Sequence, residues 1–232
     1  NAMRILSKYF EVIPYEGDIR DFKISEYYYG VLHLAALAGV RKSWLNPEEY
    51  WDVNVAGSKK VFDECERLNL RCVYASSSSI YEWWQNPYAT SKKAMEELAP
   101  KYSVGMRFHT VWSDNPRKGM FLEKLFNNKL EYVTRHYRDF IHLEDVLDAI
   151  ELLITKDYIN GTIDIGSGIP IRGQDLAPDL PIRLNTPNER EYTCAITERM
   201  NSLGWKPKYT IEKYLTNNTT DAIIVDINGE PI

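Results

Sequence analysis

The stretch that decides the fold is YASSSSIYEWWQNPYATSKKAMEELA, residues 74–99. It continues a strand-like run, residues 70–77, into four consecutive serines, and a helical pattern starts after Asn86 and Pro87. A proline directly after a capping residue is typical of the first turn of a helix. The stretch therefore predicts a strand and the helix that follows it. Its serines lie at the carboxyl end of the strand, where open α/β sheets bind their ligands.

The same alternation continues on both sides of this stretch. Strand-like apolar runs cover 30–36, 104–112, 130–133 and 161–168, and helical patterns cover 46–69, 119–128, 143–156 and 196–207. The run GVLHLAA at 30–36 is of the kind that a sheet buried on both faces requires. Strands that alternate with helices predict an α/β protein, with parallel strands and helices on both faces of the sheet.

The N-terminal segment does not fit this pattern. RIL at 4–6 and FEVIPY at 10–15 are both strand-like, yet only residues 7–9 separate them. Neighbouring parallel strands need a crossover of about a dozen residues or more. We therefore expect the printed chain to omit residues after Leu6, and we interpret Asn1 and Ala2 as the remainder of a cleaved expression tag.

Composition excludes several classes of protein. The chain has 232 residues with 44% hydrophobic content, enough for a real core. Its net charge is −5 and no Lys/Arg run exceeds two residues, so we expect no nucleic-acid partner. No apolar segment is long enough to cross a bilayer, so we expect no membrane partner and a cytoplasmic location. The histidines and the three cysteines lack the spacing of metal ligands, so we expect no metal.

Two Tyr-x-x-x-Lys matches occur, Tyr88/Lys92 and Tyr209/Lys213. The motif alone is weak, because chance alone produces such pairs in a chain rich in Tyr and Lys. The context separates them, since only Tyr88 opens a helix directly after a serine-rich strand end. Lys92 then lies one turn further along the same helix face. We take Tyr209/Lys213 as the chance match.

Nine motifs in order carry a family resemblance. They are GDIRD (17–21), HLAALAGVRKSWLNP (33–47), VNVAG (53–57), YASSSSIY (74–81), NPYATSKK (86–93), MRFHTVW (106–112), RDFIHLEDV (138–146), IGSG (165–168) and LGWKP (203–207). With them the chain resembles the extended short-chain dehydrogenase/reductase family, the NAD-dependent nucleotide-sugar epimerases and dehydratases. AGVR (38–41), ASSSS (75–79) and NPRKGM (115–120) look most like UDP-glucuronate 4-epimerases.

The resemblance implies a Rossmann-type, doubly wound parallel sheet with a small C-terminal substrate-binding lobe. The NAD-binding domain would cover 3–112, with 136–166 returning to it, and the lobe would cover 113–135 and 167–220. The resemblance also implies a nucleotide-sugar substrate and a homodimer. Met95 and Leu98 lie on the helix that pairs with the dimer mate in this family, although both could equally face the chain's own core.

The resemblance also assigns site residues. Tyr88 would be the catalytic base, Lys92 would favour its tyrosinate form, and Ser77 would hydrogen-bond the reacting hydroxyl. A free tyrosine has a pKa of about 10, so it needs such help near neutral pH. The implied cofactor-binding residues are Asp18, Ile19, Leu34, Ala35, Ala36 and Lys92. The implied substrate-binding residues are Ser78, Ser79, Thr110, Arg117 and Arg138.

These assignments favour a 4-epimerase acting on UDP-glucuronate, UDP-galacturonate or a UDP-hexose, by transient hydride transfer to NAD or NADP. Dehydratases of the family carry an acidic pair directly after the catalytic Ser/Thr, where this chain has Ser78 and Ser79. Two alternatives stay open: an NADPH-dependent 4-keto-sugar reductase, and an inactive member that only binds a nucleotide.

Two departures from the family pattern stand out. The Gly-x-x-Gly-x-x-Gly loop that wraps the cofactor pyrophosphate is not found after residues 3–6. The link from Ser77 to Tyr88 is also short for the family, so we expect a sugar pocket that is more open, or one closed by Trp83 and Trp84. Outside the motif, we interpret His33 as a core histidine and Asn54 as a residue that satisfies backbone groups in its own helix.

Overall fold

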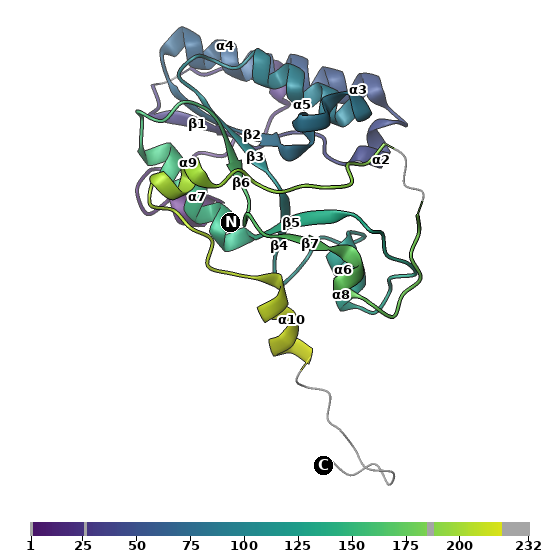
Figure 1. Cartoon of the computed structure of the whole chain (residues 1–232). Coiled ribbons are helices and arrows are strands. Elements are labelled where there is room, and N and C mark those ends of the chain that lie inside the picture. The colour runs from purple at the N-terminus through teal and green to yellow at the C-terminus, as the bar shows by residue number, and fades with distance from the viewer. Residues whose placement is uncertain (1, 26, 185–187, 220–232) are drawn as a thin grey trace, which may run out of the picture.

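The computed structural model describes residues 2–25, 27–184 and 188–219. Its main sheet has four parallel strands in the order β1-β2-β3-β6 (Figure 1). The strands are β1 (Gly30–His33), β2 (Arg71–Ser77), β3 (Val104–Phe108) and β6 (Gly161–Ile165). All four coincide with predicted strand-like runs, and the expected parallel sheet is confirmed.

The helices are α1 (Ala2–Leu6), α2 (Val40–Ser43), α3 (Pro47–Trp51), α4 (Ser58–Leu68), α5 (Pro87–Glu97), α6 (Phe121–Phe126), α7 (Leu143–Thr155), α8 (Gly173–Leu176), α9 (Glu198–Ser202) and α10 (Ile211–Thr219). Two short 3-10 helices, η1 (Ile19–Asp21) and η3 (Ser78–Gln85), and one π-helix, η2 (Asp52–Gly57), complete them. The predicted helices at 46–69, 119–128, 143–156 and 196–207 each contain helical elements of the structure.

Helices cover both faces of the main sheet, as the alternation of side chains along β2 requires. Val73 packs in a core with α7 and α9, whereas Cys72 and Tyr74 pack on the opposite face with α4 and α5. Figure 1 shows α3, α4 and α5 above the sheet and α7 with α9 below it. The sheet is therefore Rossmann-like, with the crossovers on both faces that a doubly wound fold needs.

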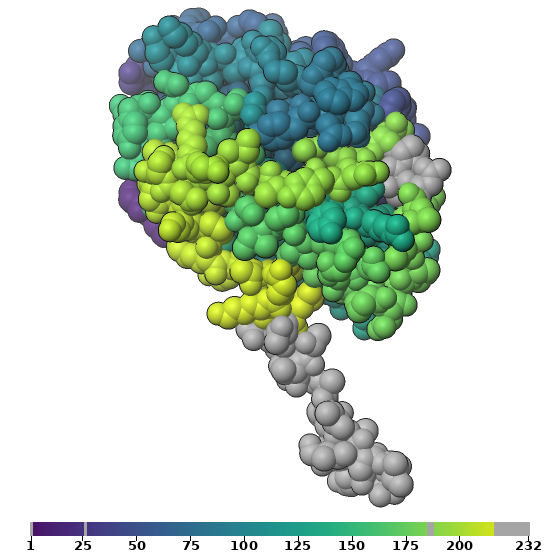
Figure 2. Space-filling model, in the orientation of Figure 1, coloured from purple at the N-terminus to yellow at the C-terminus, as the bar shows by residue number. Residues whose placement is uncertain are grey.

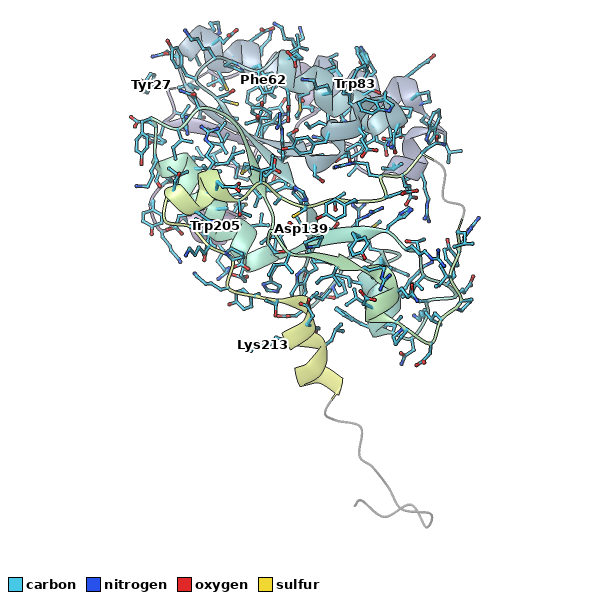
Figure 3. The ribbon with its side chains drawn as sticks, in the orientation of Figure 1. Tyr27, Phe62, Trp83, Asp139, Trp205 and Lys213 are labelled. Atoms are coloured by element: carbon cyan, nitrogen blue, oxygen red, sulfur yellow. The ribbon has the colours of Figure 1, made fainter. Side chains whose placement is uncertain are left out.

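A second sheet, in the order β4-β5-β7, lies beside the carboxyl end of the first. Its strands are β4 (Thr110–Trp112), β5 (Tyr137–His142) and β7 (Pro170–Arg172). Asp139 of β5, which Figure 3 labels near the centre of the molecule, is fully buried. Its carboxylate accepts hydrogen bonds from the backbone N–H groups of Ser167 (2.6 Å), Gly168 (2.8 Å) and Ala195 (2.9 Å). One carboxylate thus joins the turn after β6 to the segment that leads into α9, which crosses the face of the molecule in Figure 2.

The N-terminal strand predictions were wrong. Residues 4–6 belong to α1, and the chain turns on through hydrogen bonds from Ser7 N to Met3 O and from Phe10 N to Leu6 O, both 2.9 Å. In a helix the adjacent residues Ile5 and Leu6 can both pack in the core with α7. In a strand these two side chains would point to opposite faces. Residues 10–15 form no strand, so the crossover that two strands would need is not required.

The predicted strand at 130–133 was also wrong. Val133 forms only an isolated bridge with Ile182. Val133 N donates to Pro181 O at 3.0 Å and Val133 O accepts from Arg183 N at 2.8 Å. Elsewhere, no helix in the described ranges is long and apolar enough to cross a membrane.

Candidate functional site

A cavity of about 490 Å³ lies at the carboxyl end of the main sheet. Five of the predicted site residues line it: Leu34, Ala36, Ser77, Tyr88 and Lys92. They come from the segment after β1, the end of β2 and the first turns of α5. A side of the wall is apolar, because α7 contributes four aliphatic side chains, Leu143, Val146, Leu147 and Ile150. The cavity thus combines a few polar side chains with a largely apolar lining, as small-molecule sites usually do.

Local capping places Ser77 and Tyr88 beside each other. Ser77 ends β2 and caps η3, because its Oγ accepts a hydrogen bond from Ser79 N at 3.1 Å. Asn86 caps α5 in turn, accepting from Ala89 N at 2.8 Å, and Pro87 occupies the first turn. The two helical turns of η3, which meet at a kink at Glu82, therefore fill the short link and bring Tyr88 back to the end of the strand.

The Tyr88 hydroxyl lies in a desolvated environment. Burial raises the pKa of Tyr88, while a hydrogen bond with the Ser77 side chain acts in the opposite direction and lowers it. The Tyr50 ring meets the Tyr88 ring edge-on, with centroids 6.2 Å apart. Ser77 is therefore the group in this structure that favours tyrosinate, and a nearby positive charge would have to add to its effect.

Lys92 is a buried amine with 3% of its surface exposed. Its Nζ donates to the carbonyl oxygen of Ala75 at 2.9 Å and does not bond Tyr88 directly. Burial lowers the pKa of Lys92 to about 8, although the charge of Glu96 partly opposes the shift. Burial of the charged amine at the cavity wall therefore carries a cost in stability, a feature that is frequent at functional sites.

Asn54 bonds groups outside its own helix, contrary to the interpretation from the sequence. It lies in the π-helix η2 and is fully buried. Its amide accepts from Leu37 N (2.8 Å), donates to Leu37 O (3.0 Å) and donates to Ser91 Oγ (3.0 Å). Asn54 thus ties the segment after β1 to α5, one residue before Lys92, instead of serving its own helix. The signal was present in the VNVAG motif, and π-helical turns are frequent at functional sites.

His33 lies at the end of β1 and behaves as the predicted core histidine. Its Nε2 lies 2.8 Å from Ser58 Oγ, and its ring packs edge-on against Phe62. Burial lowers the pKa of His33 to about 4, and the positive charge of Lys92 adds to this shift. The ring therefore stays neutral near neutral pH.

The structure does not bring the remaining predicted residues to the cavity wall. Those outside the wall are Asp18, Ile19, Ala35, Ser78, Ser79, Thr110, Arg117 and Arg138. Asp18 is exposed and pairs with Arg20, whose hydrogen bonds lower the pKa of Asp18 to about 2. Arg138 on β5 contacts His136 Nδ1 at 3.0 Å and pairs with Glu189 at 3.9 Å.

Trp83 and Trp84 do not close the cavity, so the second of the two alternatives for the pocket was wrong. Their exposed fractions are 43% and 65%, and neither lines the cavity. Trp84 instead borders a separate surface groove with Trp44 and Trp51. The second Tyr-x-x-x-Lys pair is not part of the cavity lining either; the Tyr209 backbone N–H donates to Asp145.

Metal-ligating clusters and free thiols add no further chemistry to the described part of the cavity. Within the described part of the chain, no group of three or more His, Cys, Asp and Glu side chains is arranged to hold a metal. Cys65 and Cys72 are buried free thiols, and Cys194 is a partly exposed one. The polar and titratable residues that line the cavity are Ser76, Ser77, Tyr88, Lys92 and His109.

Comparison with known proteins gives a family match for most of the chain. Residues 13–166 match the family described as NAD dependent epimerase/dehydratase. The protein CapI of Staphylococcus aureus is 30% identical over 87% of this chain and 70% of its own length. UDP-glucuronate 4-epimerase 3 of Arabidopsis thaliana is also 30% identical, over 89% of this chain but only 59% of its own length.

Solved structures share the fold. The structure of MoeE5 in complex with UDP-glucuronic acid and NAD has a TM-score of 0.74 and 25% identity, and covers 86% of this chain and 82% of that one. A UDP-N-acetylglucosamine 4-epimerase from Methanobrevibacter ruminantium has a TM-score of 0.71 with 22% identity, over 84% of this chain and 77% of that one. The second likeness shows the common fold alone.

Proposed function

The chain belongs to the NAD-dependent epimerase/dehydratase family, and from this premise we propose that it is a nucleotide-sugar 4-epimerase. The preferred substrate is UDP-glucuronate or UDP-galacturonate, with UDP-hexoses next. The observation that supports this most directly is the meeting of Ser77, Tyr88 and Lys92 at one cavity. The proposed substrate class rests on the 30% identity to a UDP-glucuronate 4-epimerase and on the likeness to MoeE5 with UDP-glucuronic acid.

The cavity suits the reactive half of NAD. Its volume of about 490 Å³ leaves room for a nicotinamide ring against Leu34 and Ala36, with the Lys92 amine close by. The pyrophosphate half is different, because the chain has no glycine before Gly17 and therefore no glycine-rich loop after residues 3–6. We accordingly propose that Leu34, Ala36 and Lys92 hold the nicotinamide end, and we assign no residue to the pyrophosphate.

NAD, when bound, supplies the hydride acceptor and donor for C4 of the sugar. The chain's own part is proton transfer, in which Tyr88 takes the proton of the C4 hydroxyl and returns it after the sugar has turned. Ser77 holds the same hydroxyl, and its bond to Tyr88 lowers the pKa that burial raises. Lys92 adds positive charge to the wall, and the apolar side chains of α7 exclude water.

The absence of an acid favours epimerisation over dehydration. No Asp or Glu belongs to the cavity lining, as far as the described ranges 2–25, 27–184 and 188–219 show. Loss of water from the sugar requires a group that protonates the departing hydroxyl, whereas epimerisation needs only a base that later returns its proton. Ser78 and Ser79 stand where a dehydratase would carry its acidic pair.

The domain division and the dimer are part of the proposal. Residues 3–112 with 136–166 would bind the cofactor, and 113–135 with 167–220 would form the substrate lobe. Of the substrate-binding residues implied by the resemblance, Arg117 would belong to this lobe, whereas Thr110 and Arg138 would belong to the cofactor-binding part. For a homodimer, Leu98 at the C-cap of α5 is 39% exposed, whereas Met95 within α5 lies in the chain's own core.

The test is interconversion of UDP-glucuronate and UDP-galacturonate by the purified protein with NAD, followed by chromatography of the products. Y88F should lose activity by about 100-fold or more, because general base catalysis is worth that much. Y209F, from the second Tyr-x-x-x-Lys pair, is the matched control and should retain activity. Net consumption of NADPH with a keto sugar would instead support the reductase. Binding of NAD and UDP-sugar without conversion of any UDP-hexose or UDP-uronate would overturn the epimerase and leave the inactive binder.

A further inference from the structure

Arg190 lies in the segment that leads into α9, and the mechanism above does not use it. The backbone on its C-terminal side pairs with β5, because Tyr137 N donates to Glu191 O at 2.8 Å and Thr193 N donates to Tyr137 O at 3.1 Å. The Arg190 side chain is largely buried, with 16% of its surface exposed. Its guanidinium reaches η3, the link that joins the end of β2 to α5.

Three contacts hold the Arg190 guanidinium against η3. Its Nη1 donates to the carbonyl oxygen of Ser78 at 2.7 Å, across 112 positions of the sequence. Its Nε donates to Glu82 Oε1 at 3.1 Å, and the guanidinium lies over the Tyr81 ring, 5.5 Å from the ring centroid. Tyr81 is itself fixed, since its hydroxyl donates to Asp164 Oδ1 at 2.7 Å. The planar guanidinium is therefore fixed in orientation as well as in position.

The Ser78 carbonyl and the Ser79 N–H belong to one planar peptide unit, so a partner that fixes the first also fixes the second. On the other side of this unit the Ser79 N–H donates to Ser77 Oγ at 3.1 Å. The Ser77 oxygen accepts there, and its own O–H is left to donate to Tyr88. That hydrogen bond lowers the pKa of Tyr88, because it favours the tyrosinate. A continuous set of hydrogen bonds thus leads from Arg190 to the proposed base, and such bonds polarise one another.

We propose that Arg190 is a positioning residue for the reaction, which holds the Ser78–Ser79 peptide unit in the orientation that directs the Ser77 hydroxyl to Tyr88. The inference rests on the proposed function, in which Tyr88 is the base and Ser77 holds the reacting hydroxyl. Arg190 does not line the cavity, so it acts through the peptide unit and not on the substrate. Because residues 167–220 form the proposed substrate lobe, the alignment of the base depends on a side chain of that lobe.

The test compares R190M with wild type in the interconversion of UDP-glucuronate and UDP-galacturonate between pH 6.5 and 9.5. At pH 7 the kcat of R190M should fall about 10- to 100-fold, the effect of a small displacement of a catalytic group. The KM for UDP-glucuronate should stay within about threefold, because only the alignment of the base has changed. Without its donor Tyr88 ionises at higher pH. The kcat of R190M relative to wild type should therefore rise about threefold or more toward pH 9.5, the range for one hydrogen bond.

The change with pH separates positioning from a purely structural role. The other titratable groups against Tyr88 or on the cavity wall are Tyr50, Lys92 and His109, and they are the same in both proteins. A substitution that only destabilised the fold would lower kcat by one factor at every pH, through the fraction of folded protein. R199M is the matched control, because Arg199 also donates to a backbone carbonyl, that of Thr162 on β6 at 2.8 Å. It should keep the kcat and the pH profile of the wild type.

Two further variants separate the geometry of Arg190 from its charge. R190K retains one donor for the Ser78 carbonyl, so its kcat should lie between those of wild type and R190M. E82A leaves Arg190 charged but removes the carboxylate that orients it. The loss of a negative charge alone would favour tyrosinate and shift the pH profile to lower pH. Loss of alignment shifts the profile to higher pH, and this is the expected result for E82A.

A folded R190M whose kcat is unchanged, or is lowered by the same factor at every pH, would overturn the inference and leave the proposed function intact. Urea denaturation shows whether each variant is folded. If R190M does not fold, E82A decides, and a profile that is unchanged or shifted to lower pH would overturn the inference equally. Failure of the wild type to interconvert any UDP-hexose or UDP-uronate would overturn the proposed function, and the role of Arg190 with it.

Discussion

Removing the buried amine of Lys92 should make the protein more stable near neutral pH and abolish its activity. The change is K92M, which keeps a side chain of similar length without the charge. Lys92 is 3% exposed, and its Nζ has the Ala75 carbonyl oxygen as a partner at 2.9 Å. Burial lowers its pKa from 10.5 to about 8. The folded state therefore binds the proton less tightly than the unfolded chain does.

The magnitude follows from that difference in pKa. Each pKa unit corresponds to about 1.4 kcal/mol, so the burial of the charged amine costs roughly 3 kcal/mol below pH 8. Between pH 8 and 10.5 the unfolded chain holds more protons than the folded one, so the stability of the wild type rises with pH by that amount. K92M also loses the bond to Ala75, worth about 1 kcal/mol. K92M should therefore be more stable by about 2 kcal/mol at pH 7 and less stable by about 1 kcal/mol at pH 10.5.

The assay is urea denaturation of both proteins at several pH values from 7 to 10.5, because the difference between them removes the titration of all other groups. K93M is the matched control, since Lys93 occupies the next position on α5 and pairs at the surface with Glu97. A difference between wild type and K92M that stays constant over this pH range would refute the reasoning. It would mean that the amine is not desolvated in the folded protein.

Three further predictions concern the residues around the site. D139N should lower the free energy of unfolding by about 3 kcal/mol, because an amide cannot replace a carboxylate that accepts from three backbone N–H groups. A loss below about 1 kcal/mol in urea denaturation would contradict this. R107M should lower the free energy of unfolding by about 3 kcal/mol, because it leaves the buried Glu96 side chain, 4% exposed, as an unpaired charge. The double variant E96Q/R107M should lose less stability than the sum of the two single variants. As the pH falls from 6.5 to 4, the free energy of unfolding of the wild type should decrease by about 3 kcal/mol more than that of H33Q. The reason is that the folded pKa of His33 is about 4, so the unfolded chain takes up the proton first. Parallel stability curves of the two proteins would exclude a neutral buried ring.

Local patterns in the sequence were sufficient for most of the secondary structure. The alternation of apolar runs and amphipathic helices predicted the four strands of the main sheet and the helix at 143–156. The Asn86-Pro87 pair marked the start of α5, because capping depends on neighbouring residues alone. The motif order was enough to name the family and to place Ser77, Tyr88 and Lys92 together, since parallel strands end at the same edge of a sheet.

Only the tertiary structure decided what depends on contacts between distant residues. The three residues RIL at 4–6 are too few to show whether their apolar pattern has the period of a helix or of a strand. Their packing against α7 favours the helix α1. Asn54 reaches Ser91 across 37 positions, and His109 reaches Asp164 across 55. Contacts between residues so far apart have no characteristic spacing in the sequence, because they depend on which segments the fold brings together. The sequence by itself determined the family and the candidate site residues, whereas the fold determined which of them are buried, which groups hydrogen-bond them and which share one cavity.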